Sequence, residues 1–186
     1  VQVAAYRFFA SRCSEGTVLE VGCGLGEGSR ILTQGGARVV ATDLEETGIR
    51  RTRAVNPSLA GYVRCSGGVL PFASDSFDYV TCVDVIEHIP DWAGALEEMR
   101  RIARRGVMVA TPNRLHAKRK PDGSPRSYWH LFEWSPEDIA DVFREHFDSF
   151  ELSYLCGSDQ NPYWTSQRPR DRILALVAVA TSKRTS

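Results

Sequence analysis

The chain has 186 residues, of which 42% are hydrophobic, so we expect residues 1–186 to form a single globular domain with a full core. Its 23 basic residues balance its 23 acidic ones, which excludes a strong overall field toward nucleic acid or an anionic membrane. The longest apolar run, residues 173–180, is far too short to span a bilayer.

The cysteines are odd in number and form no C-x-x-C pair: Cys13, Cys23, Cys65, Cys82 and Cys156. Several lie in apolar runs, where a free thiol behaves as a small hydrophobic side chain. The first residues carry Arg7 within an apolar run and make a poor signal peptide. We therefore expect a reducing, cytoplasmic setting, with no structural zinc or other metal.

Taken in chain order, the hydrophobic pattern alternates between strand and helix. The expected strands are 17–21, 37–42, 61–65, 77–83, 106–110, 149–155 and 173–181. The expected helices are 3–12, 27–34, 45–54, 91–103 after a capping Asp91, and one from the N-cap Ser135 with Pro136 in its first turn. This alternation predicts a doubly wound α/β sheet that binds its ligand at the carboxyl ends of its strands.

The stretch from 17 to 43 carries a glycine-rich turn between a strand and a helix. Glycines at 22, 24 and 26 let the backbone approach a ligand closely, and the helix that follows offers free N–H groups. Asp43 ends the second strand, where an acid can bind both ribose hydroxyls of a nucleoside. Glu27 stands where a dinucleotide fingerprint has its third glycine, and a carboxylate there would repel a pyrophosphate. The pattern favours an adenosine-type cofactor without phosphates.

Two sequence motifs point to one family. The segment VLEVGCGLGEG (18–28) resembles the first motif of class I S-adenosylmethionine-dependent methyltransferases. The segment LPFASDSFDYVTCVDVIEHIPD (70–91), followed by TPNR at 111–114, resembles the small-molecule branch called methyltransferase type 11. The resemblance spans roughly residues 17–180. It implies a Rossmann-like, seven-stranded, mostly parallel sheet with helices on both faces and an antiparallel last strand.

The resemblance also implies the cofactor site. S-adenosylmethionine, which leaves as S-adenosylhomocysteine, is expected to contact residues around the glycine turn, the ends of the second and fourth strands and the turn after the third: Glu20, Gly22, Cys23, Gly24, Asp43, Leu44, Ser66, Gly67, Gly68, Val83 and His88. For the glycines, plain turn geometry is an alternative. Asp43 has the alternative of capping the helix that starts at Glu45.

Position 66 departs from the family pattern. The family usually has an acid four residues before Leu-Pro-Phe, where it binds the adenine amino group. This chain has Ser66, Gly67 and Gly68 instead. We therefore expect adenine to be held through a hydroxyl or through backbone amides.

Two histidines are candidate general bases. His88 follows the fourth strand, near the expected place of the methyl donor, although the Glu87-His88 pair has the alternative of organising the loop. His130 lies among aromatic residues of the loop 112–134. Together with Trp164 in the loop 156–172, these aromatics are expected to form a substrate-facing lid, with a small satellite core as the alternative. The two loops are therefore candidate substrate-facing segments.

The expected reaction is methyl transfer to an O or N atom of a small-molecule acceptor, aromatic or acidic in character. The alternatives are an NAD-type oxidoreductase and a cofactor-binding module without catalysis. A basic run could receive an anionic group, or it could be a solvated segment: Arg114, His116, Lys118, Arg119, Lys120 and Arg126. The Asn161-Pro162-Tyr163-Trp164 segment lies in the wrong place for a nucleic-acid methylation motif, so no nucleic-acid or membrane partner is expected. Oligomeric state is left open.

Overall fold

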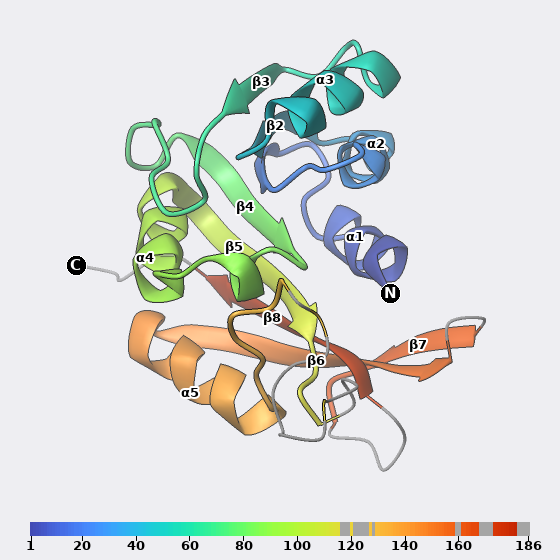
Figure 1. The fold of residues 1–186 in the computed structure, drawn as a ribbon, viewed down its shortest axis with the longest axis vertical. Helices are drawn as coiled ribbons and strands as arrows, with labels where there is room; N and C mark the ends of the chain where they lie inside the picture. The colour runs from blue at the N-terminus through green and yellow to red at the C-terminus, as the bar shows by residue number, and fades with distance from the viewer. Residues whose placement is uncertain (116–119, 121–126, 128, 159–160, 168–172, 182–186) are drawn as a thin grey trace.

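The computed structural model describes residues 1–115, 120, 127, 129–158, 161–167 and 173–181. Within these residues the chain forms one eight-stranded sheet in the order β3-β2-β1-β4-β5-β8-β6-β7 (Figure 1). The strands are β1 (Thr17–Val21), β2 (Arg38–Asp43), β3 (Gly61–Arg64), β4 (Phe77–Val83), β5 (Ala103–Pro112), β6 (Ser149–Ser158), β7 (Asn161–Thr165) and β8 (Ile173–Thr181).

Helices cover both faces of the sheet (Figure 1). They are α1 (Gln2–Ala10), α2 (Glu27–Gln34), α3 (Glu46–Val55), α4 (Trp92–Ile102), α5 (Pro136–His146) and the short 3-10 helix η1 (Ile86–His88). The predicted cap of α4 is confirmed, because the Asp91 side chain accepts a hydrogen bond from the Gly94 amide at 3.0 Å. The predicted start of α5 is confirmed as a full capping box between Ser135 and Asp138.

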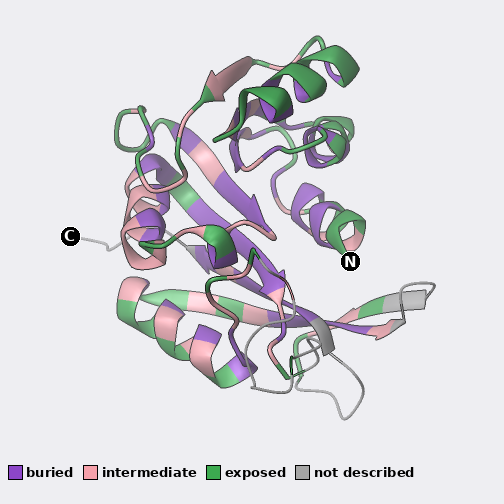
Figure 2. Cartoon of the chain, in the orientation of Figure 1, coloured by how far each residue is buried: buried purple, intermediate pink, exposed green. Residues whose placement is uncertain are grey.

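The strands β1 to β5 pair in parallel, and β8 runs antiparallel to both β5 and β6. The expected doubly wound α/β fold, mostly parallel with an antiparallel last strand, is therefore confirmed. Buried residues run along the central strands (Figure 2). On one face they pack against apolar side chains of α4 and α5, such as Leu96 and Phe143, and on the other against those of α1 and α2, such as Phe9 and Leu32.

The expected count of seven strands is wrong, because an eighth strand lies in the expected loop 156–172. β6 continues to Ser158, and β7 pairs back onto it in an antiparallel hairpin with Leu155 opposite Trp164 and Cys156 opposite Tyr163. Tyr163, Trp164 and Thr165 favour extended backbone, which is the signal that the aromatic-loop interpretation passed over. The other seven strands occur where they are predicted, with shifts at their ends.

The strand order reverses beside β1, since β2 and β3 lie on one side of it and β4 on the other. Ligands of open α/β sheets bind outside the carboxyl ends of the strands at such a reversal. Those ends are Val21, Asp43 and Val83. None of the helices in the described parts of the chain is long and apolar enough to cross a membrane.

Candidate functional site

The glycine turn leads directly from β1 into α2. Gly22, Gly24 and Gly26 all have positive φ, at 79°, 50° and 83°, a backbone region that glycine adopts at little cost. The amides of Gly22 and Cys23 donate to the Thr42 carbonyl at 2.9 and 2.8 Å, which ties the turn to β2. A Cβ at Gly22 would lie 2.3 Å from a methyl of Val85, whereas a Cβ at Gly24 would meet nothing within 4 Å. The turn is packed on one side and open at Gly24.

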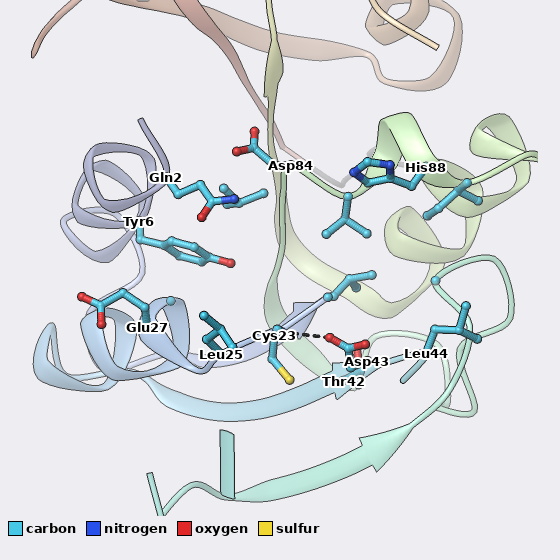
Figure 3. Close-up of a pocket in the computed structure, with 18 of the residues that line it drawn as sticks. Gln2, Tyr6, Cys23, Leu25, Glu27, Thr42, Asp43, Leu44, Asp84 and His88 are labelled. Carbon is cyan, nitrogen blue, oxygen red and sulfur yellow. Dashed lines mark hydrogen bonds between the residues drawn. The ribbon is translucent and has the colours of Figure 1, made fainter. Parts of the chain in front are cut away.

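Asp43 stands at the end of β2 and faces this turn. Its Oδ2 accepts a hydrogen bond from the Gly24 amide at 2.8 Å (Figure 3). Its Oδ1 accepts one from the Glu45 amide at 2.9 Å. The second bond fits the alternative that Asp43 supports the entry to α3. The first bond places the same carboxylate beside the glycine turn, where the ribose is predicted to bind.

A pocket of about 580 Å³ opens at this edge of the sheet. Its walls come from α1, the glycine turn, the ends of β2 and β4, the turn after β3, and η1 (Figure 3). This volume lies in the range of small-molecule and cofactor sites. Nine of the predicted site residues line it: Gly22, Cys23, Gly24, Asp43, Leu44, Ser66, Gly67, Val83 and His88.

Three predicted residues do not line this pocket: Glu20, Gly68 and His130. Glu20 is fully buried on β1, behind the glycine turn, where it accepts a hydrogen bond from the Ser29 hydroxyl of α2. Burial raises the pKa of Glu20 to about 7; the neighbouring hydroxyls of Ser29 and Tyr6 oppose this shift and the Asp43 charge adds to it. Glu20 therefore supports the pocket from behind.

The sequence interpretation missed the contribution of α1. Gln2, Val3 and Tyr6 on this helix line the pocket opposite Asp43 (Figure 3). Tyr6 is buried, and its ring lies against α2 at Gly28. The periodic spacing predicted the helix, but it gave no sign that polar residues of its first turn reach the site.

Asp84 is a further pocket residue that was missed. It follows β4, lines the pocket, and holds a positive φ of 50°, an unusual backbone conformation for a residue other than glycine. Burial raises its pKa, and the neighbouring Gln2, His130 and His88 oppose the shift. A charged residue directly after an apolar strand was a visible signal for a site residue.

The two predicted histidines lie together. The rings of His88 and His130 have centroids 5.1 Å apart in an edge-to-face arrangement. His88 lines the pocket, while His130 stands behind it with Nδ1 3.1 Å from a carboxylate oxygen of Glu133. The structure thus brings both candidate bases to one edge of the pocket.

The aromatic residues of the two long segments divide between different roles. Trp134 is buried and packs against Trp92 and Phe132 in the main hydrophobic core, so it belongs neither to a lid nor to a separate satellite core. Trp129 is 75% exposed, and Trp164 packs on Phe8 of α1 with ring centroids 4.6 Å apart. A single aromatic lid is not formed by these described residues.

The basic run is described only at two positions. Arg114 pairs with Asp138 at 2.8 Å, and Lys120 is exposed. His116, Lys118, Arg119 and Arg126 lie outside the described residues.

A small side chain at position 28 is required where α1 crosses α2. A Cβ on Gly28 would come within 2.1 Å of the Tyr6 ring and 2.2 Å of a Glu20 carboxylate oxygen, and both side chains are buried. We expect Gly28→Ala to lower the free energy of unfolding by about 2 kcal/mol, as overpacking does. Urea denaturation measures this loss. Gly68→Ala is the matched control, because its Cβ would meet no atom closer than 3.9 Å. Equal stability of the two variants would contradict the packing argument.

The comparisons with known proteins agree with this geometry. The family model described as "Methyltransferase domain" matches residues 19–111. A "Probable S-adenosylmethionine-dependent methyltransferase" of Mycobacterium tuberculosis is 31% identical over 84% of this chain and 57% of its own length. A ubiquinone biosynthesis O-methyltransferase of Hahella chejuensis is 35% identical over 52% of this chain and 43% of its own length. The chain spans about half the length of these curated relatives.

A solved structure of the small RNA methyltransferase HEN1 superimposes with a TM-score of 0.77 at 19% identity, covering 98% of this chain and 25% of that one. At that identity the likeness concerns the fold alone. The predicted family and its S-adenosylmethionine cofactor are thus confirmed by the match over 19–111, which includes the glycine turn, Asp43 and η1. The chain belongs to the class I family of S-adenosylmethionine-dependent methyltransferase domains.

Proposed function

We propose that this chain transfers a methyl group from S-adenosylmethionine to an oxygen or nitrogen atom of a small-molecule acceptor. The observation that carries the proposal is the position of Asp43, whose carboxylate meets the Gly24 amide at the open part of the glycine turn. A carboxylate that borders open space is suited to accept hydrogen bonds from the two hydroxyls of a ribose.

The residues present fit the cofactor. The turn at Gly24 leaves space that any side chain there would occupy, so the backbone can lie against a ligand. Leu44 and Ile89 offer apolar surface near Ser66 and Gly67, a combination suited to adenine without an acid at position 66. At the other end of the pocket, the polar groups of Gln2 and Tyr6 suit the amino-acid part of the cofactor.

When bound, S-adenosylmethionine supplies a methyl group already activated on a sulfonium. The protein's part is then to align the acceptor, exclude water and, for a hydroxyl acceptor, take up a proton. His88 at the pocket wall, with His130 directly behind it, is the candidate for the last task, and the Nδ1 of each ring is engaged with an oxygen.

One relative has a name that states the atom it methylates, and this name supports an oxygen acceptor on a small molecule. The Hahella protein is named for O-methylation in ubiquinone biosynthesis, and its match covers about half of this chain. The balanced charge of the chain also gives it no net positive charge that would attract a nucleic-acid acceptor.

Calorimetric titration of the purified chain with S-adenosylmethionine, S-adenosylhomocysteine and NAD tests the cofactor. We expect micromolar binding of the first two and none of NAD. Transfer of a labelled methyl group to a panel of phenols, catechols and amines then identifies the acceptor. Cofactor binding without transfer to any acceptor class would favour a binding module without catalysis, and no binding at all would overturn the proposal.

A further inference from the structure

Side chains of the types that bind metals meet at the edge of the pocket. Glu87 and His88 belong to η1, and His130 comes from the segment before α5. One potential ligand atom from each lies within 4.8 Å of the other two. Glu87 is buried, His130 is partly buried, and His88 lines the pocket. We propose that Glu87, His88 and His130 bind a divalent transition-metal ion of the Zn²⁺ type.

The two segments that carry these residues are fixed to each other by backbone hydrogen bonds. The Glu87 carbonyl accepts from the Leu131 amide at 2.9 Å and from the Phe132 amide at 3.3 Å. His130 therefore stands next to η1 because of main-chain pairing, independently of any attraction between the side chains. A site assembled in this way exists before the metal arrives.

Both histidines are oriented as metal ligands usually are. His88 Nδ1 lies 2.7 Å from the Trp129 carbonyl oxygen, which can only accept, so Nδ1 carries the proton. His130 Nδ1 meets the Glu133 carboxylate at 3.1 Å, which fixes the same tautomer. In each ring the lone pair is thus on Nε2. Histidine ligands typically donate their other N–H to a carbonyl or carboxylate, which holds the ring in place.

Two carboxylates at the cluster each have an oxygen atom without a hydrogen-bond partner. One oxygen of Glu87 accepts from the Thr111 hydroxyl at 3.2 Å, while the other, Oε1, is buried without a hydrogen-bond partner. Asp84, three residues earlier and beside the same histidines, also keeps an unpartnered buried oxygen, Oδ1. Unpartnered buried oxygens are costly, and a cation would satisfy them.

The ligand set indicates the kind of ion and its purpose. Two imidazoles and one carboxylate suit Zn²⁺, Fe²⁺ or Mn²⁺ and leave coordination positions open. His88 brings the cluster to the pocket wall, so the open positions would receive an oxygen of the ligand in the pocket. In this step the inference rests on the proposed function. It selects a hydroxyl acceptor, whose pKa a bound metal would lower. With the ion in place, His88 and His130 would act as its ligands and no longer as general bases.

The site departs from the expectation that the chain has no structural zinc or other metal. We expect the chelator-treated protein to bind one Zn²⁺, measured by competition with a fluorescent chelator. His88→Ala should weaken the affinity at least about tenfold, since ligands and even their supporting groups have effects of that size. His88 is exposed, so this variant is expected to fold. His130→Ala should act in the same way.

His146→Ala is the matched control, because His146 pairs with Glu97 at 2.8 Å on the α4–α5 side of the molecule. It should bind Zn²⁺ as the unmodified chain does. Equal Zn²⁺ binding by the unmodified chain and by a His88→Ala/His130→Ala double variant would overturn the site. S-adenosylmethionine titrations of the same preparations separate the two proposals. A preparation of the unmodified chain that binds S-adenosylmethionine but no Zn²⁺ contradicts the metal site alone. One that binds Zn²⁺ but no S-adenosylmethionine contradicts the proposed function alone.

Discussion

Replacing Asp43 by Asn should weaken the binding of S-adenosylmethionine by about 10- to 100-fold. Asparagine keeps the shape of the side chain and one acceptor oxygen for the Gly24 or Glu45 amide. It removes the negative charge, and hydrogen bonds to a charged group contribute about 1.5–3 kcal/mol, while each 1.4 kcal/mol is about a factor of ten in affinity. Isothermal titration calorimetry at constant salt measures the change directly.

The control for Asp43 is Glu45→Gln, because Glu45 is an exposed acid two residues away. It should bind the cofactor with unchanged affinity. Thermal unfolding of both variants checks that the entry to α3 survives the loss of the Asp43 charge. Unchanged affinity in a folded Asp43→Asn variant would mean that Asp43 only supports α3 and that the ribose is held elsewhere.

The buried Glu20 should make the stability of the cofactor-free chain depend on pH. Burial raises its folded pKa from 4.5 to about 7, so the folded state holds a proton that the unfolded state releases. The contribution of this group is fully present below about pH 4.5 and is lost as pH rises through about 7. Between low pH and pH 8, this loss lowers the free energy of unfolding by about 3 kcal/mol. The figure follows from about 1.36 kcal/mol for each unit by which the folded and unfolded pKa values differ.

Glu20→Gln should remove this dependence, because an amide keeps an acceptor for the Ser29 hydroxyl and carries no charge. The measurement is the difference in free energy of unfolding between variant and unmodified chain, taken from urea curves at pH 5 and pH 8. Other carboxyls titrate in both proteins and cancel in that difference. The variant should gain stability relative to the unmodified chain at the higher pH. An exposed control, Glu145→Gln on α5, should show no such trend. If the Glu20→Gln curves also run parallel to those of the unmodified chain, Glu20 is not the responsible group.

Much of the fold could be predicted from the sequence because local signals and tertiary structure agree. The glycine turn, with its positive φ at Gly22, fixes where β1 ends, and the capping box at Ser135 fixes where α5 begins. Asp43 could be placed at the site because the carboxyl ends of parallel strands share one edge of a sheet. These features depend on neighbours in the chain or on a general rule of the topology.

The features that were missed depend on contacts between distant parts of the chain. Gln2 and Tyr6 reach the pocket only because α1 packs across α2, and no local pattern reports that crossing. Trp134 enters the core through contact with Trp92 on α4, so its loop position was misleading. β7 exists only because β6 offers it an edge to pair with, and edge pairing is weakly marked in sequence.

The packing of α1 against the pocket has a consequence for how the chain holds its ligand. The helix carries Gln2, Val3 and Tyr6 into the pocket wall, and it is docked by Phe9 in the core and by a tight seam with α2 around Gly28. Segments of a domain open locally at different free energies, and elements that line ligand sites are often among the less stable ones. A ligand that contacts this wall binds only the docked form, so occupancy shifts the equilibrium toward docking. An occupied pocket is therefore expected to hold α1 against the sheet more firmly than an empty pocket does.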